Sequence, residues 1–218
     1  MEDNENLQGG GKNERLVPEG QAVPLSRRAW LEFKELLADA AFPFIVMLVL
    51  STMIILFADY SDDLGVSLAA LIGGEIMFTA ALVIFGRANG STAYGKTVLN
   101  NQKRELGSTE EKVVCRTGEY ALWKGALVAA MICVPFIIVQ IIELCYANVY
   151  TGFCLKYMFG WAYYPFSYLG KSYQALNFIM ILLPLTAHTV GYHLGKLHQI
   201  KIQQAIAERK ENKKRRKK

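Results

Sequence analysis

The segment that decides the fold is LGVSLAALIGGEIMFTAALVIFG, residues 64–86. It holds 23 residues, and Glu75 is the only charged one among them. A helix rises about 1.5 Å per residue and the hydrocarbon core of a bilayer is about 30 Å thick, so roughly 20 apolar residues are enough to cross it. The run is too long for a typical strand and does not alternate as a barrel strand does. We therefore predict a transmembrane helix over 64–86.

Three other stretches have the same character. Residues 40–58 and 172–195 contain no Asp, Glu, Lys or Arg, and 125–147 contains only Glu143. An overall composition of 52% apolar and 20% charged residues would suit a soluble domain, but the charges are concentrated between these runs. This distribution excludes a soluble globule, a disordered chain and a disulfide-rich secreted protein. The predicted fold class is an all-α integral membrane protein with four transmembrane helices, at about 40–58, 64–86, 125–147 and 172–195.

The basic residues predict the orientation of this bundle. Of the 24 Lys and Arg, 22 lie in the segments 1–39, 87–124 and 196–218, and two lie in 143–171. Because basic residues are retained on the cytoplasmic side, we expect both termini to be cytoplasmic in a protein of the plasma membrane. The last six residues are all basic, which favours contact with anionic lipids of the inner leaflet over a nucleic-acid partner.

The segments outside the spans divide the chain further. Residues 1–25 are polar and Gly-rich, which predicts a disordered cytoplasmic leader. Residues 26–39 place Trp30, Phe33 and Leu37 at helical spacing, which indicates an amphipathic helix along the inner leaflet or the cytoplasmic start of a longer first helix. The expected organisation is completed by a four-helix membrane domain over 40–195, a basic cytoplasmic loop at 87–124, an outer aromatic loop at 148–171 and a basic cytoplasmic tail at 196–218.

The outer aromatic loop has two interpretations. Its part 157–170 is uncharged but only 14 residues long, and it contains Pro165. Aromatic rings with polar tips are favoured at the membrane interface, so we interpret the loop as an interfacial or re-entrant segment packed on the bundle. A fifth span is the alternative.

Residues 90–97, GSTAYGKT, match the phosphate-binding pattern G-x-x-x-x-G-K-[ST]. In a nucleotide hydrolase that loop follows a buried strand and cradles phosphates with its backbone amides. Here the preceding apolar run is a membrane span, and the 38 residues of 87–124 are too few for the βα units of such a fold. We therefore interpret the match as a chance one, in a flexible Gly-rich exit from the second span, and we expect no enzyme.

Glu75 is the main candidate for function. Eleven uncharged residues flank it on each side, which places it at the bilayer midplane, where a charge costs roughly 2.5–3.5 kcal/mol to insert. His188 lies about 6 Å from the level of Glu75 if both helices are regular, and Tyr192 follows one turn later. These three residues form a candidate intramembrane polar site. The alternative for Glu75 is a protonated side chain that fixes helix packing with a hydrogen bond.

Small residues and cysteines complete the candidates. Small residues at helical spacing allow helices to pack closely in lipid, either within the chain or in a dimer, and the stripes predicted here contain Gly73, Gly74, Ala187, Gly191 and Gly195. Cys145 and Cys154 lie toward the outer face, where they could form a disulfide. The histidines are spaced five apart, which separates them around a helix, so we expect no metal site and no cofactor.

The function hypothesis follows from these candidates. We expect a non-enzymatic interaction, assembly or regulatory component of the cytoplasmic membrane. Its partners would be the lipid bilayer and either another membrane protein or further copies of the chain. The alternative is a small proton- or ion-linked transporter or channel subunit that uses Glu75 and His188.

Overall fold

The computed structural model describes residues 23–60, 64–167 and 171–215, and the expected leader lies almost entirely outside them. Within this part the chain is helical, with no β-strand. The elements are α1 (Leu25–Tyr60), α2 (Leu64–Glu105), α3 (Glu111–Val114), α4 (Leu122–Cys145), α5 (Val149–Met158), α6 (Gly160–Ser167), the 3₁₀ helix η1 (Lys171–Ile181) and α7 (Leu182–Arg215). Four of the described helices, α1, α2, α4 and the one formed by η1 and α7, are long and apolar enough to cross a membrane, as predicted.

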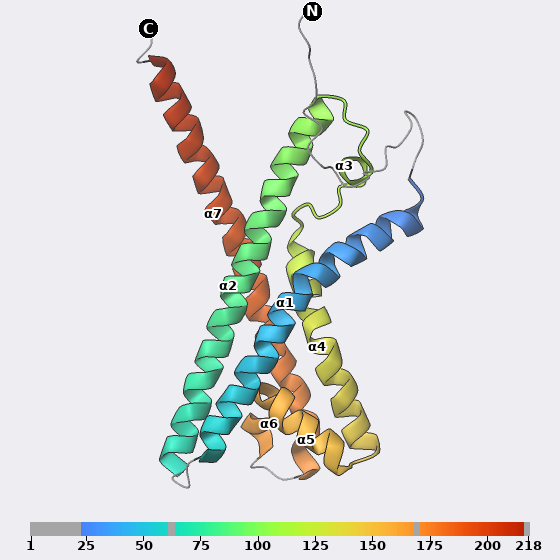
Figure 1. The fold of residues 1–218 in the computed structure, drawn as a ribbon, viewed down its shortest axis with the longest axis vertical. Helices are drawn as coiled ribbons and strands as arrows, with labels where there is room; N and C mark the ends of the chain where they lie inside the picture. Colours follow the sequence, from blue (N-terminus) through green and yellow to red (C-terminus); the bar gives the residue numbers. More distant parts are fainter. Residues whose placement is uncertain (1–22, 61–63, 168–170, 216–218) are drawn as a thin grey trace, which may run out of the picture.

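Helix α1 joins the expected juxtamembrane helix and the first span into one continuous element. Its first turns are inclined away from the spanning part in Figure 1, and Pro43 lies inside the helix. Proline lacks an N–H and clashes with the carbonyl four residues earlier, which bends a helix. That carbonyl belongs to Asp39, and it accepts a hydrogen bond from Asn89 Nδ2 of α2 at 3.1 Å. The bend thus frees an acceptor that fixes α1 to α2.

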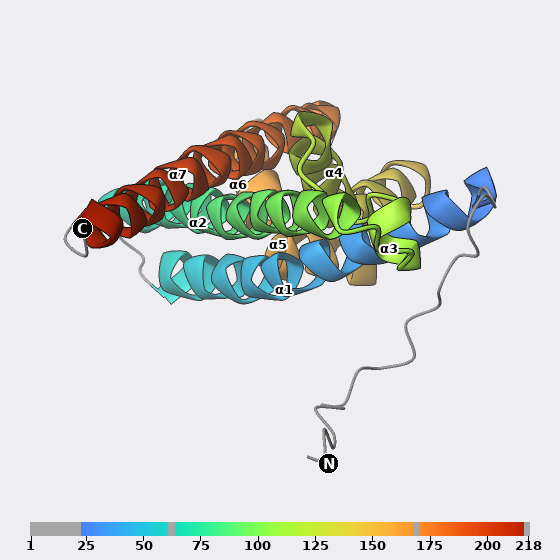
Figure 2. The same ribbon diagram turned by 90° about the horizontal axis from the view of Figure 1, so that it is seen from above.

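Helix α2 is longer than the sequence predicted. It continues from the expected span through the 90–97 motif to Glu105. The prediction of a flexible Gly-rich segment at 90–97 is therefore wrong. The physical reason is tertiary packing: α2 and α7 cross and pack against each other around this stretch, as Figures 1 and 2 show. A Cβ at Gly86 or Gly90 would overlap the main-chain oxygens of His188 or Tyr192. The glycines therefore serve a close helix contact instead of a loop.

The described part of the aromatic segment, 148–167, is also more regular than an interfacial loop. It forms α5 and α6, two short helices joined at Phe159, and the ring of Trp161 is only 2% exposed. Trp161 stacks on Phe78 of α2 with ring centroids 5.0 Å apart. It also packs on Phe136 of α4 at 5.4 Å.

The turn between α5 and α6 enters the bundle deeply. The amide of Gly160 donates to Ser51 Oγ at 2.7 Å, and Ser51 is fully buried on α1. Ser51 lies eight residues from Asp59, roughly 12 Å along the helix. Lys156 of α5 pairs with Asp59 at 2.6 Å, and Tyr164 of α6 donates to Asp59 at 2.5 Å. The segment thus forms two short helices that turn into the bundle, and both helices are held by the carboxylate of Asp59.

The last span begins with a stretch of 3₁₀ helix and changes to α-helix at Leu182. Pro184 lies in the first turn of α7, where its missing N–H is tolerated. Because Pro184 cannot donate to the carbonyl of Met180, a regular α-helical ladder cannot run from η1 through this point. The tail expected to continue this helix is helical as far as Arg215.

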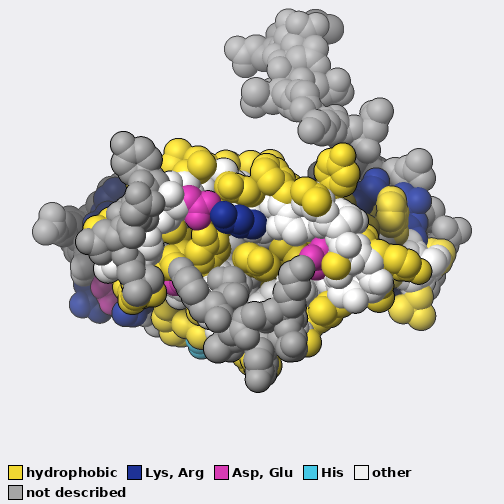
Figure 3. Space-filling view, turned by 90° about the horizontal axis from the view of Figure 1, so that it is seen from below, with side chains coloured by type: hydrophobic (Ala, Val, Ile, Leu, Met, Phe, Trp, Pro, Cys, Tyr) yellow, Lys and Arg dark blue, Asp and Glu magenta, His cyan; other side chains and the backbone are white. Residues whose placement is uncertain are grey.

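The described part of the end opposite the tail is largely apolar. Figure 3 views this end and shows hydrophobic side chains around it, with basic and acidic side chains beside one another near its middle. Cys145 and Cys154, which the sequence offered as a possible disulfide, are both free in this structure. Glu143 faces α5 and accepts a hydrogen bond from Thr151. Cys145 is two residues further along α4, about 200° around the helix, and is exposed on another side.

Candidate functional site

Glu75 lines a groove of about 780 Å³ on α2. The other wall comes from α6, η1 and α7, through Tyr164, Pro165, Met180 and Leu183. The remaining lining residues are Leu68, Leu71, Ile72, Ile76, Thr79 and Ala80. Among the described residues that line this apolar groove, Glu75 is the only one with a carboxylate.

The carboxylate of Glu75 is incompletely hydrogen-bonded. Its Oε2 atom is buried and has no hydrogen-bond partner among the described residues. The hydroxyl of Thr79 donates to the main-chain oxygen of Glu75 at 2.8 Å, so this neighbour is already used by the backbone. The Tyr164 hydroxyl, on the opposite wall, donates to Asp59. A ligand that fills the groove would find an unsatisfied acceptor there.

His188 is fully buried and contacts a different part of the bundle. Its Nδ1 atom lies 2.9 Å from the main-chain oxygen of Gly125 on α4. A carbonyl oxygen only accepts, so Nδ1 carries the proton and Nε2 is left as an acceptor. Nε2 is buried and has no partner within the described part of the chain. His188 therefore ties α7 to α4.

The structure does not bring Glu75 and His188 together. The main chain of His188 lies against Gly86, which is eleven residues from Glu75 and therefore roughly 16 Å further along α2. His188 is also absent from the lining of the groove. The sequence placed the two within about 6 Å of one level because it aligned the ends of two regular helices. In the structure the expected ends do lie together, since Gly195 packs on Arg87, but the side chain of His188 is directed to Gly125 on α4.

Tyr192 belongs to an aromatic stack near the expected cytoplasmic side of the bundle. It is 1% exposed, and its ring stacks on Tyr120 with centroids 5.1 Å apart. Gly125 leaves room for Tyr192, because a Cβ on that glycine would lie 2.8 Å from the Tyr192 Cβ. Burial raises the pKa of Tyr120, so its hydroxyl stays protonated at neutral pH, 3.1 Å from His193 Nδ1. Tyr192 thus packs the core about 16 Å or more from Glu75.

The small residues fall into two groups. Gly191 and Gly195 lie against the main chain of α2, at Val83 and Arg87, and Ala187 is buried on the same helix. Gly74 packs on the side chain of Ile54 of α1, whereas a Cβ on Gly73 would meet nothing within 4 Å. All but Gly73 therefore contribute to packing within the chain.

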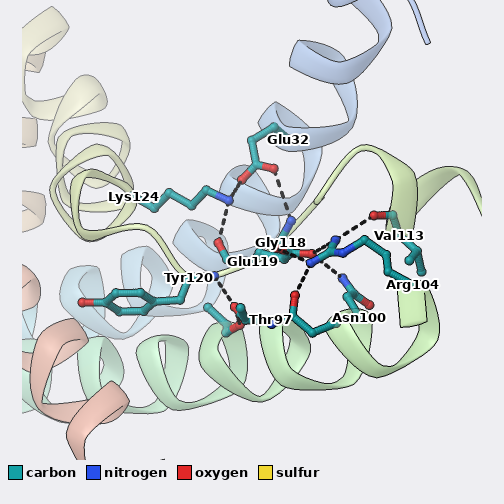
Figure 4. A network of polar contacts seen from close by, with 11 residues as sticks. Glu32, Thr97, Asn100, Arg104, Val113, Gly118, Glu119, Tyr120 and Lys124 are labelled. Carbon is teal, nitrogen blue, oxygen red and sulfur yellow. Dashed lines mark hydrogen bonds and ion pairs between the residues drawn. The ribbon is translucent and has the colours of Figure 1, made fainter. Parts of the chain in front are cut away.

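Sequence reasoning missed a network of polar contacts between α1, α2 and the α3–α4 connection. Lys124 is 7% exposed, pairs with Glu32 of α1, and donates to the main-chain oxygen of Glu119 at 2.7 Å. The Glu119 carboxylate accepts from Arg104 at 2.6 Å and from Asn100 at 3.2 Å. Figure 4 shows how these side chains converge from three elements. A signal for this network was present in the sequence. Acidic residues recur at 32, 35 and 39, about one turn apart, and so place carboxylates along one side of α1.

The residues of the 90–97 motif also take part in packing. Lys96 pairs with Glu35 of α1 at 2.8 Å. Thr97 donates to the main-chain oxygen of Ala93 and accepts from the amide of Tyr120 at 2.8 Å. Since the whole stretch is α-helical, its amides are bonded within the helix and cannot form a phosphate cradle.

The end of α3 has an unusual residue at its left-handed position. The amide of Arg116 donates to Val113 and that of Thr117 to Lys112, which is the Schellman pattern of a helix C-terminus. Arg116 occupies the position that usually carries glycine, with φ of 58°. A side chain in this conformation costs roughly 1–2 kcal/mol. The chain therefore keeps an arginine at a place where glycine would be more stable.

Comparison with protein-family models, curated proteins and solved structures found no match for this chain.

Proposed function

We propose that this chain is a non-enzymatic component of the cytoplasmic membrane that binds another membrane protein through the α2 groove at Glu75. The distribution of basic residues supports a topology with both termini in the cytoplasm. One observation carries the proposal: Glu75 has a buried oxygen atom that lacks a hydrogen-bond partner among the described residues, and it lies in an apolar groove.

The low burial of α2 within the chain supports this proposal. In its most apolar 18-residue stretch 17% of the residues are buried, against 33% in α1, 39% in α4 and 33% in the helix that ends in the tail. The side chains of Ile72, Ile76 and Met77 are 57–65% exposed on this helix. Lipid tails would cover such a face, but they offer no hydrogen bond to Glu75. A helix of a partner protein can pack on the apolar face and, through a polar side chain, donate a hydrogen bond to the Glu75 carboxylate.

A second copy of this chain is a poorer occupant. In a two-fold contact through the groove each chain would offer the other the same residues. The hydroxyl groups of that groove, on Thr79 and Tyr164, donate to the Glu75 main chain and to Asp59. Glu75 would therefore meet another carboxylate. We propose a partner helix that brings its own donor, such as Ser, Thr, Asn, Gln or Lys.

The transport alternative rested on a pair formed by Glu75 and His188. Because the two lie on different parts of the bundle, with His188 against Gly86 and Gly125, no contact favours a proton path between them.

Photo-crosslinking in the membranes of cells that express the full chain tests the proposal. A photoreactive amino acid replaces Ile76 at the groove, and in the matched control it replaces Ile138, which is 52% exposed on α4. We expect a discrete adduct from position 76 only, and its peptide maps to a transmembrane segment with a polar donor. The adduct should persist in Glu75→Gln and disappear in Glu75→Leu. Equal adducts at both positions, or adducts only with this chain itself, would contradict the proposal.

A further inference from the structure

We infer that the cleft between the first turns of α1 and the α3–α4 connection binds the phosphate group of an anionic lipid from the cytoplasmic leaflet. The cleft has a volume of about 470 Å³. Its lining includes Leu25, Arg28 and Ala29 on one side and Arg116, Tyr120 and Trp123 on the other. This inference is independent of the groove at Glu75, which is lined by α2, α6, η1 and α7 and shares no residue with the cleft.

The charges of the cleft favour an anion. Two carboxylates also line it, but Glu32 is paired with Lys124, and Glu119 is paired with Arg104. Arg28 and Arg116 are exposed, and neither forms an ion pair with a carboxylate of the described residues. Two guanidinium groups that line one cleft from separate elements are suited to the oxygens of a phosphate.

The backbone at Arg116 is a separate observation in favour of a ligand. Its φ of 58° is a conformation in which glycine is the usual residue, and the Schellman hydrogen bonds hold it there. Strained residues kept by the surrounding structure are typical of ligand sites. Arg28 of α1 and Cys115, the residue before Arg116, line the same cleft. The backbone at Arg116 is therefore fixed before any ligand binds, at the edge of a cleft that also contains Arg28.

The apolar rim of the cleft indicates a lipid as the source of the phosphate. Leu25 is 85% exposed and Trp123 56% exposed, although both lie at the edge of the basic cleft. Trp123 is the second residue of α4, next to the predicted membrane surface, where tryptophan is enriched. A free phosphate ion would gain nothing from this rim, whereas a phospholipid presents an anionic head and acyl chains together.

Protection of Cys115, which lines the cleft, tests the inference. The full chain is placed in nanodiscs of phosphatidylcholine with or without phosphatidylglycerol, and the alkylation rate of Cys115 by a neutral maleimide is followed by mass spectrometry. We expect phosphatidylglycerol to slow alkylation. Loss of each arginine, in Arg28→Gln or Arg116→Gly, should weaken lipid binding about fivefold. Because glycine suits the position of Arg116, that variant should be at least as thermally stable as the parent chain.

Two controls make the outcome specific. Arg209→Gln combined with Arg215→Gln removes two exposed basic residues from the tail and should leave the protection unchanged. Inorganic phosphate added to phosphatidylcholine nanodiscs should not protect Cys115. Equal loss of protection in the tail variant would show non-specific attraction to the surface and would overturn the inference. Protection by inorganic phosphate alone would overturn the assignment to a lipid.

Discussion

The carbonyl oxygen of His188 on α7 occupies the space in which a Cβ at Gly86 of α2 would lie. Helices α2 and α7 therefore touch backbone to backbone at this point. Gly90 repeats the contact one turn later against Tyr192. In lipid, such close contacts between helices replace the hydrophobic effect as a source of helix association.

We expect Gly86→Ala to destabilise the protein and Gly73→Ala to leave it unchanged or slightly more stable. A methyl at position 86 overlaps main-chain atoms that cannot move aside cheaply, and overpacking costs roughly 1–3 kcal/mol. A methyl at position 73 meets nothing within 4 Å, and alanine is favoured over glycine in a helix. The midpoint of thermal unfolding in detergent measures the stability change of each variant. Equal midpoints for the two variants would show that the α2–α7 contact is looser than described.

We expect Lys124→Met to destabilise the protein by about 3 kcal/mol, because it leaves the Glu32 carboxylate without its ion-pair partner. The double variant Lys124→Met with Glu32→Gln should regain part of that loss. Lys112→Met removes an exposed lysine nearby and serves as the control. Unfolding by denaturant, followed by circular dichroism, distinguishes the three. A double variant no more stable than Lys124→Met alone would argue against coupling between the two residues.

Truncation of Trp161 should weaken the packing of α5 and α6 against the rest of the bundle. Its ring fills the space between Phe78 and Phe136, so Trp161→Ala leaves a cavity and should cost about 3–5 kcal/mol. Trp30→Ala, at a ring 55% exposed, should change stability by less than about 0.5 kcal/mol. Limited proteolysis within α5 and α6 reports this change. If α5 and α6 of Trp161→Ala were as resistant to proteolysis as those of the parent chain, the buried position of α6 would be contradicted.

Alkylation of Cys115 should have a shifted pH dependence. Burial raises the pKa of this thiol above its ordinary value of 9.0. The reactive thiolate is therefore scarcer than in a free thiol at pH 8, and the rate should still increase above pH 9. Mass spectrometry of the modified peptide across this pH range, with a small cysteine-containing peptide as the reference, gives the two profiles. A profile for Cys115 that levels off at or below pH 9 would contradict the raised pKa.

The sequence predicted the four long apolar helices because each is a property of local composition. An uncharged run such as 40–58 or 172–195 has few alternatives to a membrane span, whatever surrounds it. The same local reasoning failed at Gly86 and Gly90. A glycine-rich stretch is compatible with either a loop or a close helix contact, and only the position of α7 decides between them.

The candidate site divides in the same way. Glu75 stands out in the sequence because a carboxylate inside an apolar run is costly, and the structure places it in a groove. Its proposed partner His188 is elsewhere, because the side chain of His188 is directed to Gly125 on α4. The cleft at Arg28 and Arg116 joins residues 88 positions apart, and no local pattern connects them.

The sequence by itself determined that four helices are long and apolar enough to cross a membrane, and that Glu75 is an ionisable residue among apolar neighbours. Both depend on the free energy of moving single residues out of water. Only the tertiary structure decided which helices touch, that α5 and α6 fold into the bundle, and that Arg116 and Arg28 line one cleft. These depend on the shapes of surfaces brought together from distant parts of the chain, where one Cβ decides whether two backbones meet.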